Sequence, residues 1–383
     1  MDNPSPDLRA HFSTVDDPRI DRTKRHPLID ILIIALAAML GGADNWVEIE
    51  AFGRARQAWL ATFLDLPNGI PSHDTFNRVF NRLDPEQFRK AFLRWTQSVQ
   101  KHIEGEVIAV DGKVLCGSQE RKLGQSAIDM VSAWATEQRL VLAQRKVDEK
   151  SNEITAIPDL LRVLDLQGCI VTIDAMGTQT AIAQEIVAGG GEYILALKGN
   201  QGQLHEDVQR LFAELERSGY QAYAHDYTQT THKGHGRIEE RECWVIAEEE
   251  VLKHLRGFER WEKLTSVACV RSRRHLENGE VEIADRYFLN SVEGAEQVLE
   301  GIRSHWGIEN QLHWVLDIAF GEDQSRVRRG HGAENLAVLR HLTLNLLRLD
   351  TSMKGSIKKK RLVAGWNPEF LEKLLFGALV TPN

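Results

Sequence analysis

The stretch "VIAVDGKVLCG", residues 107 to 117, joins an apolar run directly to an acidic residue. Residues 107–110 are apolar and mostly β-branched, as in a buried strand, and Asp111 follows them without a break. A lone carboxylate is costly to bury unless it takes up a proton or finds a partner. We therefore expect Asp111 to lie where something compensates its charge.

The chain is long enough for a full-sized core and one or two smaller domains. It has 383 residues, 42% of them hydrophobic, which is typical of a globular protein. Its longest apolar run, "LIDILIIALAAML" at 28–40, is shorter than the roughly 20 residues that cross a bilayer and predicts a buried helix. The opening "MDNPSPDLRA" lacks the basic and apolar regions of a signal peptide, so we expect a cytoplasmic protein without a membrane partner. Four widely spaced cysteines favour reduced, mostly buried thiols over a zinc site.

The charge is unevenly distributed along the chain. The formal net charge of −8 argues against a simple nucleic-acid binder. From Gln324 to the end, however, there are 11 Lys and Arg against 4 Asp and Glu, including "RVRRGH" at 326–331 and "KGSIKKKR" at 354–361. Either segment could follow a phosphate backbone, although a solvated basic segment is the more common explanation.

Residues 1–104 have the apolar spacing of a helical domain. "PSHDTFNRVFNRL" at 71–83 begins with a capping serine, Ser72, and continues with apolar residues on one face, which predicts a capped amphipathic helix. Such a domain could place Arg78 and Arg82 in a DNA groove. Packing of the helices explains the same pattern about as well.

The pattern changes after residue 104 and predicts an α/β fold. Residues 105–219 contain three predicted strands and then alternating helices and strands, which indicates a mixed sheet flanked by helices. Residues 220–292 are alternating and turn-rich, as expected for a β-rich insertion, and helical sequence resumes over 293–350. Residues 351–383 form a basic C-terminal segment.

A second acidic residue repeats the pattern of Asp111. In "IVTIDAMGTQ", Asp174 ends an apolar strand just before a predicted helix. Ligands gather at the carboxyl ends of strands in an α/β sheet, so the two acids could share a site, and a divalent cation could relieve their repulsion. The alternative is that each acid caps the element that follows it.

Further acidic residues lie in "HWGIENQLHWVLDIAFGED" at 305–323. His305, Glu309, His313 and Asp317 follow at helical spacing and could share one face. Magnesium prefers oxygen ligands, which favours a site of carboxylates over a histidine-rich zinc site. Spacing alone does not choose Glu309 over Asp317 or the acids at 322 and 323.

Four motifs together resemble the H-repeat-associated insertion-sequence family of DDE transposases. They are "IAVDGKVLCGS", "VTIDAMGTQ", "YILALKGNQ" and the 305–323 motif, they occur in the family's order, and the resemblance extends over nearly the whole chain, including "DPRIDRTKRHPLIDIL". It implies a ribonuclease H-like catalytic domain interrupted by a β-rich insertion. It also implies that Asp111, Asp174 and Glu309 are the catalytic residues and hold two Mg²⁺ ions, for which Mn²⁺ could substitute.

The residues that would hold DNA phosphates differ from those of the family. Related transposases carry a Tyr, an Arg and a Lys around the catalytic Glu, and the matching positions here hold Ile302, His305 and Leu316. Other polar, basic and aromatic residues could take over this role. Each also has an alternative explanation: a polar turn, a solvated hairpin or a tryptophan in the core. The candidate DNA-binding residues are Lys198, Asn200, His235, Arg237, Arg303, His305 and Trp306.

The resemblance predicts a transposase that cleaves double-stranded DNA at the ends of its own element and joins them to target DNA. A homodimer is expected because two ends must be held together. Two alternatives remain open: a metal-dependent nuclease without strand transfer, and a non-catalytic or domesticated DNA-binding relative. A dinucleotide-dependent enzyme is disfavoured, because "GGG" at 189–191 lacks the spaced glycines of a dinucleotide loop.

Overall fold

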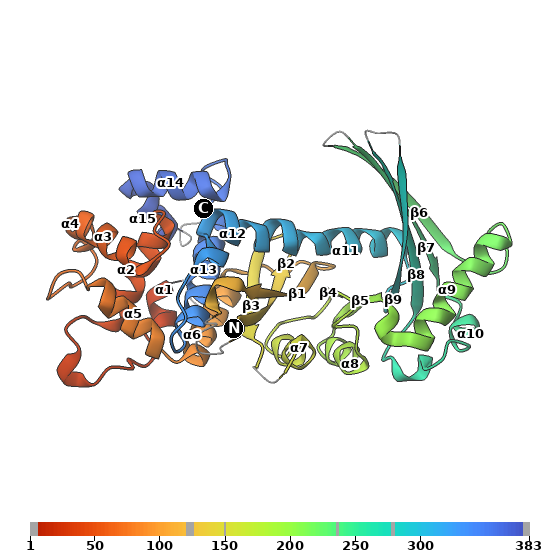
Figure 1. The fold of residues 1–383 in the computed structure, drawn as a ribbon, viewed down its shortest axis with the longest axis horizontal. Coiled ribbons are helices and arrows are strands. Elements are labelled where there is room, and N and C mark those ends of the chain that lie inside the picture. The colour runs from red at the N-terminus through yellow and green to blue at the C-terminus, as the bar shows by residue number, and fades with distance from the viewer. Residues whose placement is uncertain (1–6, 120–125, 149–150, 235–236, 277–279, 378–383) are drawn as a thin grey trace.

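The computed structural model describes residues 7–119, 126–148, 151–234, 237–276 and 280–377 (Figure 1). The strands are β1 (Val107–Leu115), β2 (Ile128–Ala135), β3 (Leu140–Lys146), β4 (Ile170–Ile173), β5 (Glu192–Leu197), β6 (Asp226–Gly234), β7 (Arg237–Ile246), β8 (Ser266–His275) and β9 (Val281–Asn290). The helices before and within the sheet are α1 (Leu8–Phe12), α2 (Leu28–Leu40), α3 (Trp46–Ala55), α4 (Gln57–Leu60), α5 (His73–Arg82), α6 (Pro85–Val99), α7 (Glu153–Leu161), α8 (Thr180–Ala188), α9 (Gly202–Arg217) and α10 (Glu249–Leu252). The later helices are α11 (Ala295–Gly307), the π-helical turn η6 (Ile308–His313), α12 (Trp314–Phe320), α13 (Gly332–Leu349), α14 (Ile357–Trp366) and α15 (Pro368–Phe376).

The described strands form one mixed sheet in the order β3-β2-β1-β4-β5-β9-β8-β7-β6. β1 is antiparallel to β2 and parallel to β4, and β4 is parallel to β5. The predicted α/β class with a mixed sheet and flanking helices is therefore confirmed. The strands of the segment 220–292 continue this sheet, because β9 pairs antiparallel with β5. They curve away at one end of the molecule (Figure 1).

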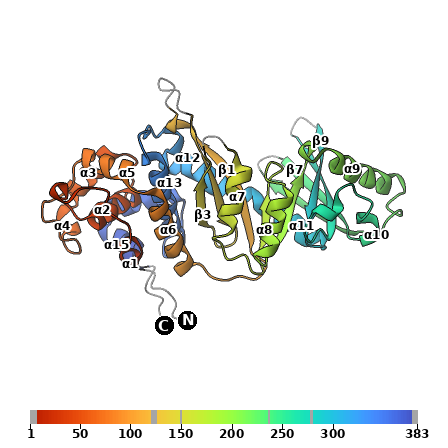
Figure 2. The ribbon, with the colours of Figure 1, turned by 90° about the horizontal axis from the view of Figure 1, so that it is seen from below.

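The two faces of the central strands are covered by different helices. Because side chains alternate along a strand, Ile108 and Val110 point to the core that includes α7 and α8. Val107 packs instead with the residues of α11. α7 and α8 thus lie on one face and α11 on the other (Figures 1 and 2). The same alternation directs Asp111 toward α11.

The N-terminal helices share one core with the C-terminal helices. α2 is buried from Asp30 onward, and residues of α13, α14 and α15 pack in the same cluster. The basic sequence at 354–361 is therefore partly buried in a helix: Lys360 donates to Leu347 O at 2.8 Å, and Arg361 donates to Met39 O at 2.9 Å. These two cations satisfy helix-end carbonyls, so they are not part of a solvated basic segment.

Several local predictions agree with the structure. The Ser72 side chain caps α5 by accepting from the Thr75 amide. Cys116 is exposed, and the other three cysteines are buried and unbridged. Within the described residues, no helix is both long enough and apolar enough to cross a membrane.

Candidate active site

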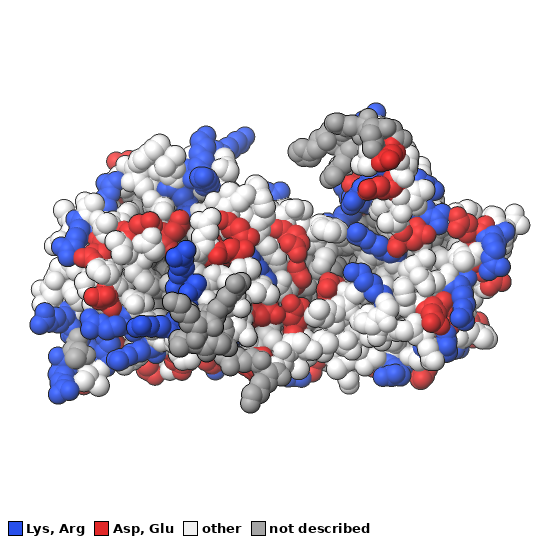
Figure 3. Space-filling model, viewed as in Figure 1, with Lys and Arg blue, Asp and Glu red and all other residues white. Residues whose placement is uncertain are grey.

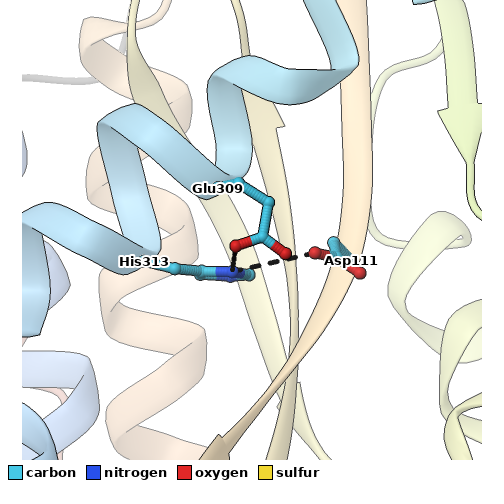
Figure 4. A group of neighbouring side chains, drawn as sticks. All are labelled: Asp111, Glu309 and His313. Carbon is cyan, nitrogen blue, oxygen red and sulfur yellow. Dashed lines mark ion pairs between the residues drawn. The ribbon is translucent and has the colours of Figure 1, made fainter. Parts of the chain in front are cut away.

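β1 and the turn after α11 bring Asp111 and Glu309 together, although 198 positions separate them in the sequence. Asp111 lies near the middle of β1 on the α11 side, with 16% of its side chain exposed, whereas 51% of the Glu309 side chain is exposed. One ligand atom from each of Asp111, Glu309 and His313 lies within 4.8 Å of the others (Figure 4). Asp111 therefore lies in a group of side chains that could share a cation.

The electrostatics of this group favour a cation. Burial, followed by the charge of Glu309, raises the pKa of Asp111 to about 8, although the Gly112 amide opposes the shift. Neither carboxylate has a Lys or Arg ion-pair partner in the part of the chain that the structure describes. Two close carboxylates of this kind are relieved either by a shared proton or by a divalent ion.

His313 adds a nitrogen to the two carboxylates. Its Nδ1 atom lies 3.6 Å from Glu309 Oε2 and 3.7 Å from Asp111 Oδ2 (Figure 4). Burial lowers the pKa of His313 to about 4, although Glu309 opposes this shift. The ring is therefore neutral at pH 7 and can offer a lone pair to a metal ion. Its Nε2 atom is buried without a hydrogen-bond partner among the described residues.

Asp174 lines the same cavity but takes a second role. The cavity has a volume of about 270 Å³, and Asp111, Asp174 and Glu309 all line it. Asp174 Oδ1 accepts hydrogen bonds from the amides of Met176 at 2.9 Å and Gly177 at 3.2 Å. Asp174 Oδ1 therefore caps the turn after β4 and does not cap α8, whose N-cap residue is Gln179. Among the described residues, the group whose ligand atoms lie within 4.8 Å of one another consists of Asp111, Glu309 and His313 and does not include Asp174.

Two other acids of the 305–323 motif, Asp317 and Glu322, are neutralised. Lys113, two residues after Asp111 on the same face of β1, forms an ion pair with Asp317 and lies 3.3 Å from Glu322. Glu322 is also 3.5 Å from Arg340. Asp317 and Glu322 thus have cationic partners, unlike Glu309. The sequence shows that Asp111 and Lys113 are two residues apart, and so on the same face of a strand, but it does not show which acids Lys113 contacts.

A π-helical turn interrupts the helical segment that carries the 305–323 motif. It covers residues 308–313, between α11 and α12, and such turns often occur at functional sites. His305, before the turn, is half-buried and its Nδ1 atom lies 3.0 Å from Thr172 Oγ1. Burial lowers the pKa of His305, although Asp174 and Glu309 oppose the shift.

The predicted DNA-binding residues are placed in different surroundings. Lys198, His305 and Trp306 line the cavity of the three acids. Asn200 Nδ2 donates to Ala175 O at 2.6 Å, so it joins the loops that follow β4 and β5. Arg303 lies outside this cavity, 2.6 Å from His232 Nε2. β7 begins at Arg237, whose side chain is outside the described part of the chain, and His235 lies outside the described residues.

A second, basic cavity adjoins the first along α11. It has a volume of about 500 Å³ and shares Arg286, Ile302 and Trp306 with the cavity of the acids. Arg286 stacks over Trp306 at 5.5 Å, which sequence reasoning did not anticipate. The basic side chains that line the second cavity are His232, Lys233, Arg241, Arg274, Arg286 and Arg303.

Comparison with known proteins identifies the family. The profile described as "Transposase DDE domain" matches residues 103–346, and "DDE_Tnp_1-associated" matches residues 9–96. The chain belongs to the DDE transposase family. The chain is 40% identical over 372 residues to "Putative transposase YncI" of Escherichia coli O157:H7, covering 96% of this chain and 94% of that one. The resemblance noted from the motifs is thereby confirmed.

A relative named for the H repeat is similar over the same length. The chain is 36% identical over 376 residues to "H repeat-associated putative transposase YhhI" of Escherichia coli K12, covering 97% of this chain and 98% of that one. Among solved structures, a piggyBac transposase in a synaptic complex with hairpin DNA aligns with 98% of this chain and 78% of its own. At 11% identity and a TM-score of 0.44, that likeness is too low to assign the fold.

Proposed function

We propose that this protein is a metal-dependent DNA transposase that cleaves at the ends of its own insertion sequence and joins them to target DNA. The observation that carries the proposal is the convergence of Asp111, Asp174 and Glu309 on one cavity in a chain of the DDE transposase family. A ribonuclease H-like core is part of the proposal. It is supported by the order β3-β2-β1-β4-β5, with three antiparallel strands followed by two parallel ones.

The donor set of the cavity fits divalent cations with hard oxygen ligands. Asp111 and Glu309, which have no Lys or Arg partner among the described residues, and Asp174 beside them supply the carboxylate oxygens that Mg²⁺ or Mn²⁺ prefers. His313 Nδ1 is available as a further ligand. A bound pair of such ions would activate the attacking water or 3′ hydroxyl and stabilise the leaving oxygen.

The remaining residues would position the DNA. The basic cavity beside α11 could follow the phosphate backbone up to the acids, because Arg303 and Arg286 offer guanidinium groups along that route. Lys198 would approach the backbone from the loop after β5. Trp306, with 47% of its surface exposed and Arg286 over its ring, offers a face on which a base could stack.

The test is cleavage of DNA that carries the element ends. Asp111→Asn, Asp174→Asn and Glu309→Gln should each lower the Mg²⁺-dependent cleavage rate at least about a thousandfold, in the range seen when one member of an interdependent catalytic group is removed. Binding of the same DNA should persist. Asp323→Asn, an exposed acid of the same motif, is the matched control and should cleave normally. A triple variant that still cleaves would reject the proposal.

Two further measurements separate the alternatives. A nuclease without strand transfer would cut the ends but leave the 3′ hydroxyl unjoined when target plasmid is supplied. A non-catalytic DNA-binding relative would bind the ends and cut neither strand in Mg²⁺ or Mn²⁺. We expect both cutting and joining, and we expect the active species to be a dimer in size-exclusion chromatography with end DNA.

A further inference from the structure

Six arginines line one open cavity on the N-terminal helices. The cavity has a volume of about 610 Å³, and no acidic residue is among the described residues that line it. Basic side chains gather in this region, at the lower left of the face drawn in Figure 3. The basic lining residues come from the segment before α2, from α3 and from α5: Arg19, Arg22, Arg25, His26, Arg54, Arg78 and Arg82. We call this set the arginine cavity.

Two of the six arginines have acidic partners. Arg19 binds Asp17 at 2.7 Å and donates to His26 O at 2.6 Å, so it holds the segment before α2 in place. Arg54 pairs with Glu50 at 2.7 Å. These contacts hold Arg19 and Arg54 in place as part of the cavity lining.

The other four arginines are exposed and have no acidic partner. Arg22, Arg25, Arg78 and Arg82 form no ion pair with any acid in the described part of the chain. Arg78 and Arg82 are four residues apart on α5, so they lie on one face of that helix. Four unpaired guanidinium groups around one cavity repel one another, and a bound polyanion would relieve the repulsion.

The chemistry of the cavity fits a phosphate backbone. Guanidinium groups bind phosphate oxygens through two parallel hydrogen bonds. His26 also lines the cavity, and its Nδ1 atom is buried without a hydrogen-bond partner among the described residues. No Phe, Tyr or Trp is among the lining residues, so the surface lacks the stacking platform that single strands require.

We propose that the arginine cavity binds the phosphate backbone of double-stranded DNA. The inference rests on the proposed function for the identity of the nucleic acid. The arginine cavity and the cavity of the three acids share no lining residue, so this contact is additional to the catalytic one. Contacts to phosphates alone carry no base information, and the surface therefore anchors DNA without regard to its sequence.

The experiment compares two sets of four substitutions in the full chain. Binding to an element-end duplex and to a scrambled duplex is measured in EDTA, so that no strand is cut. In the variant R22Q/R25Q/R78Q/R82Q, the affinity for both duplexes should fall at least about tenfold at about 0.1 M salt. The slope of log K against log salt concentration should become less negative by about 3 to 4. The reason is that each lost phosphate contact removes about 0.9 from that slope.

The matched control removes the same charge at the other end of the molecule. R210Q/R217Q/K253Q/R260Q changes four exposed cations of α9 and of the region after it (Figure 1) and should leave affinity and slope unchanged within about twofold. A second test variant, R22K/R25K/R78K/R82K, keeps the charge and should keep most of the slope. Unchanged melting temperatures exclude unfolding as the cause.

Three results would overturn the proposal. They are an unchanged slope in R22Q/R25Q/R78Q/R82Q, an equal loss in the control set, and a loss confined to single-stranded DNA or RNA. Failure of the proposed function gives a different result. The four Gln substitutions would still weaken DNA binding as predicted, but wild type would not cleave DNA in Mg²⁺.

Discussion

Asp111 and Glu309 are distinguished from Asp317 and Glu322 by what surrounds them. Asp317 and Glu322 are neutralised by Lys113, whereas Asp111 and Glu309 face each other and the neutral ring of His313. Two uncompensated carboxylates that are held close together in a folded protein repel each other, and a bound cation lowers this repulsion. The neighbours of each acid therefore separate ligand candidates from structural ion pairs.

At the same scale, His313→Gln tests whether the histidine supports metal binding. Removing the nitrogen near Asp111 and Glu309 should weaken Mn²⁺ binding by roughly tenfold or more, the range typical for changes around a metal site. Isothermal titration without DNA measures this directly. His254→Gln, an exposed histidine after α10, is the control. Equal Mn²⁺ affinity in all three proteins would contradict a role for His313.

Asp30 gives a pH-dependent prediction. It is 5% exposed on α2, its Oδ2 atom has no partner among the described residues, and burial raises its pKa above the ordinary 3.8. Because the folded state holds this proton more tightly, the contribution of Asp30 to stability is full below about pH 3.8 and is lost as the pH rises through the folded-state pKa. Asp30→Asn should therefore be more stable than wild type at neutral pH, by about 1 kcal/mol, and the difference should shrink in acid.

Urea unfolding at neutral and acidic pH measures this difference. Glu282→Gln, at an exposed position on β9, should show no such trend. A neutral-pH stability of Asp30→Asn at or below that of wild type would refute the assignment.

The sequence revealed two acids that follow apolar runs, Asp111 and Asp174, but could not choose among the helical ones. Asp174 follows β4, whereas Asp111, which was expected at a strand end, lies inside β1, because that strand continues to Leu115. Glu309, Asp317 and Glu322 look alike in one dimension, since the partner that separates them, Lys113, is about 200 residues away. Here the family motif supplied the choice that spacing could not.

At the scale of elements, α11 must lie close to the sheet for Glu309 to reach Asp111. A Cβ atom on Gly301 would lie 2.5 Å from Ile194 Cδ1, so the glycine permits the approach of α11 to β5. Glycine within a helix costs about 1 kcal/mol relative to alanine, which favours a packing reason for its presence. The π-helical turn begins at Ile308, about two helical turns after Gly301.

Gly301→Val should push α11 away from the sheet. We expect a loss of about 1 to 3 kcal/mol in the free energy of unfolding and a lower cleavage rate, since Glu309 moves with the helix. Glu300→Val places the same side chain on the exposed side of α11 and should change both quantities little. Wild-type stability and activity in Gly301→Val would contradict this account of α11.

At the scale of the whole molecule, segments that are far apart in sequence share one sheet or pack in one core. The strands of 220–292 look like a separate β-rich insertion in the sequence, but β9 continues the central sheet through β5. The basic C-terminal sequence likewise packs with the N-terminal helices. Neither arrangement could be predicted, because strand pairing and helix docking at long range leave no local pattern. Domain boundaries at 104, 219, 292 and 350 stay a prediction.

Arg361 joins three parts of the molecule. It donates to the carbonyls of Met39, Ala43 and Ala319 and binds Asp44 at 2.7 Å, and so links α14 with the end of α2 and with α12. Arg361→Met should lower the free energy of unfolding by about 3 kcal/mol or more, because buried acceptors lose their donor.

Lys358→Met, an exposed change on the same helix, is the control for Arg361→Met. Thermal unfolding compares the two variants with wild type. Equal melting temperatures would show that Arg361 does not join these helices.

The most direct measurement is the anomalous scattering of Mn²⁺ in crystals of this protein. Peaks should lie among the carboxylates of Asp111, Asp174 and Glu309 in wild type and disappear in Glu309→Gln. Peaks at Asp317 or Glu322 instead, or no peak at the three acids at saturating Mn²⁺, would contradict the assignment of this cavity as the metal-dependent catalytic site.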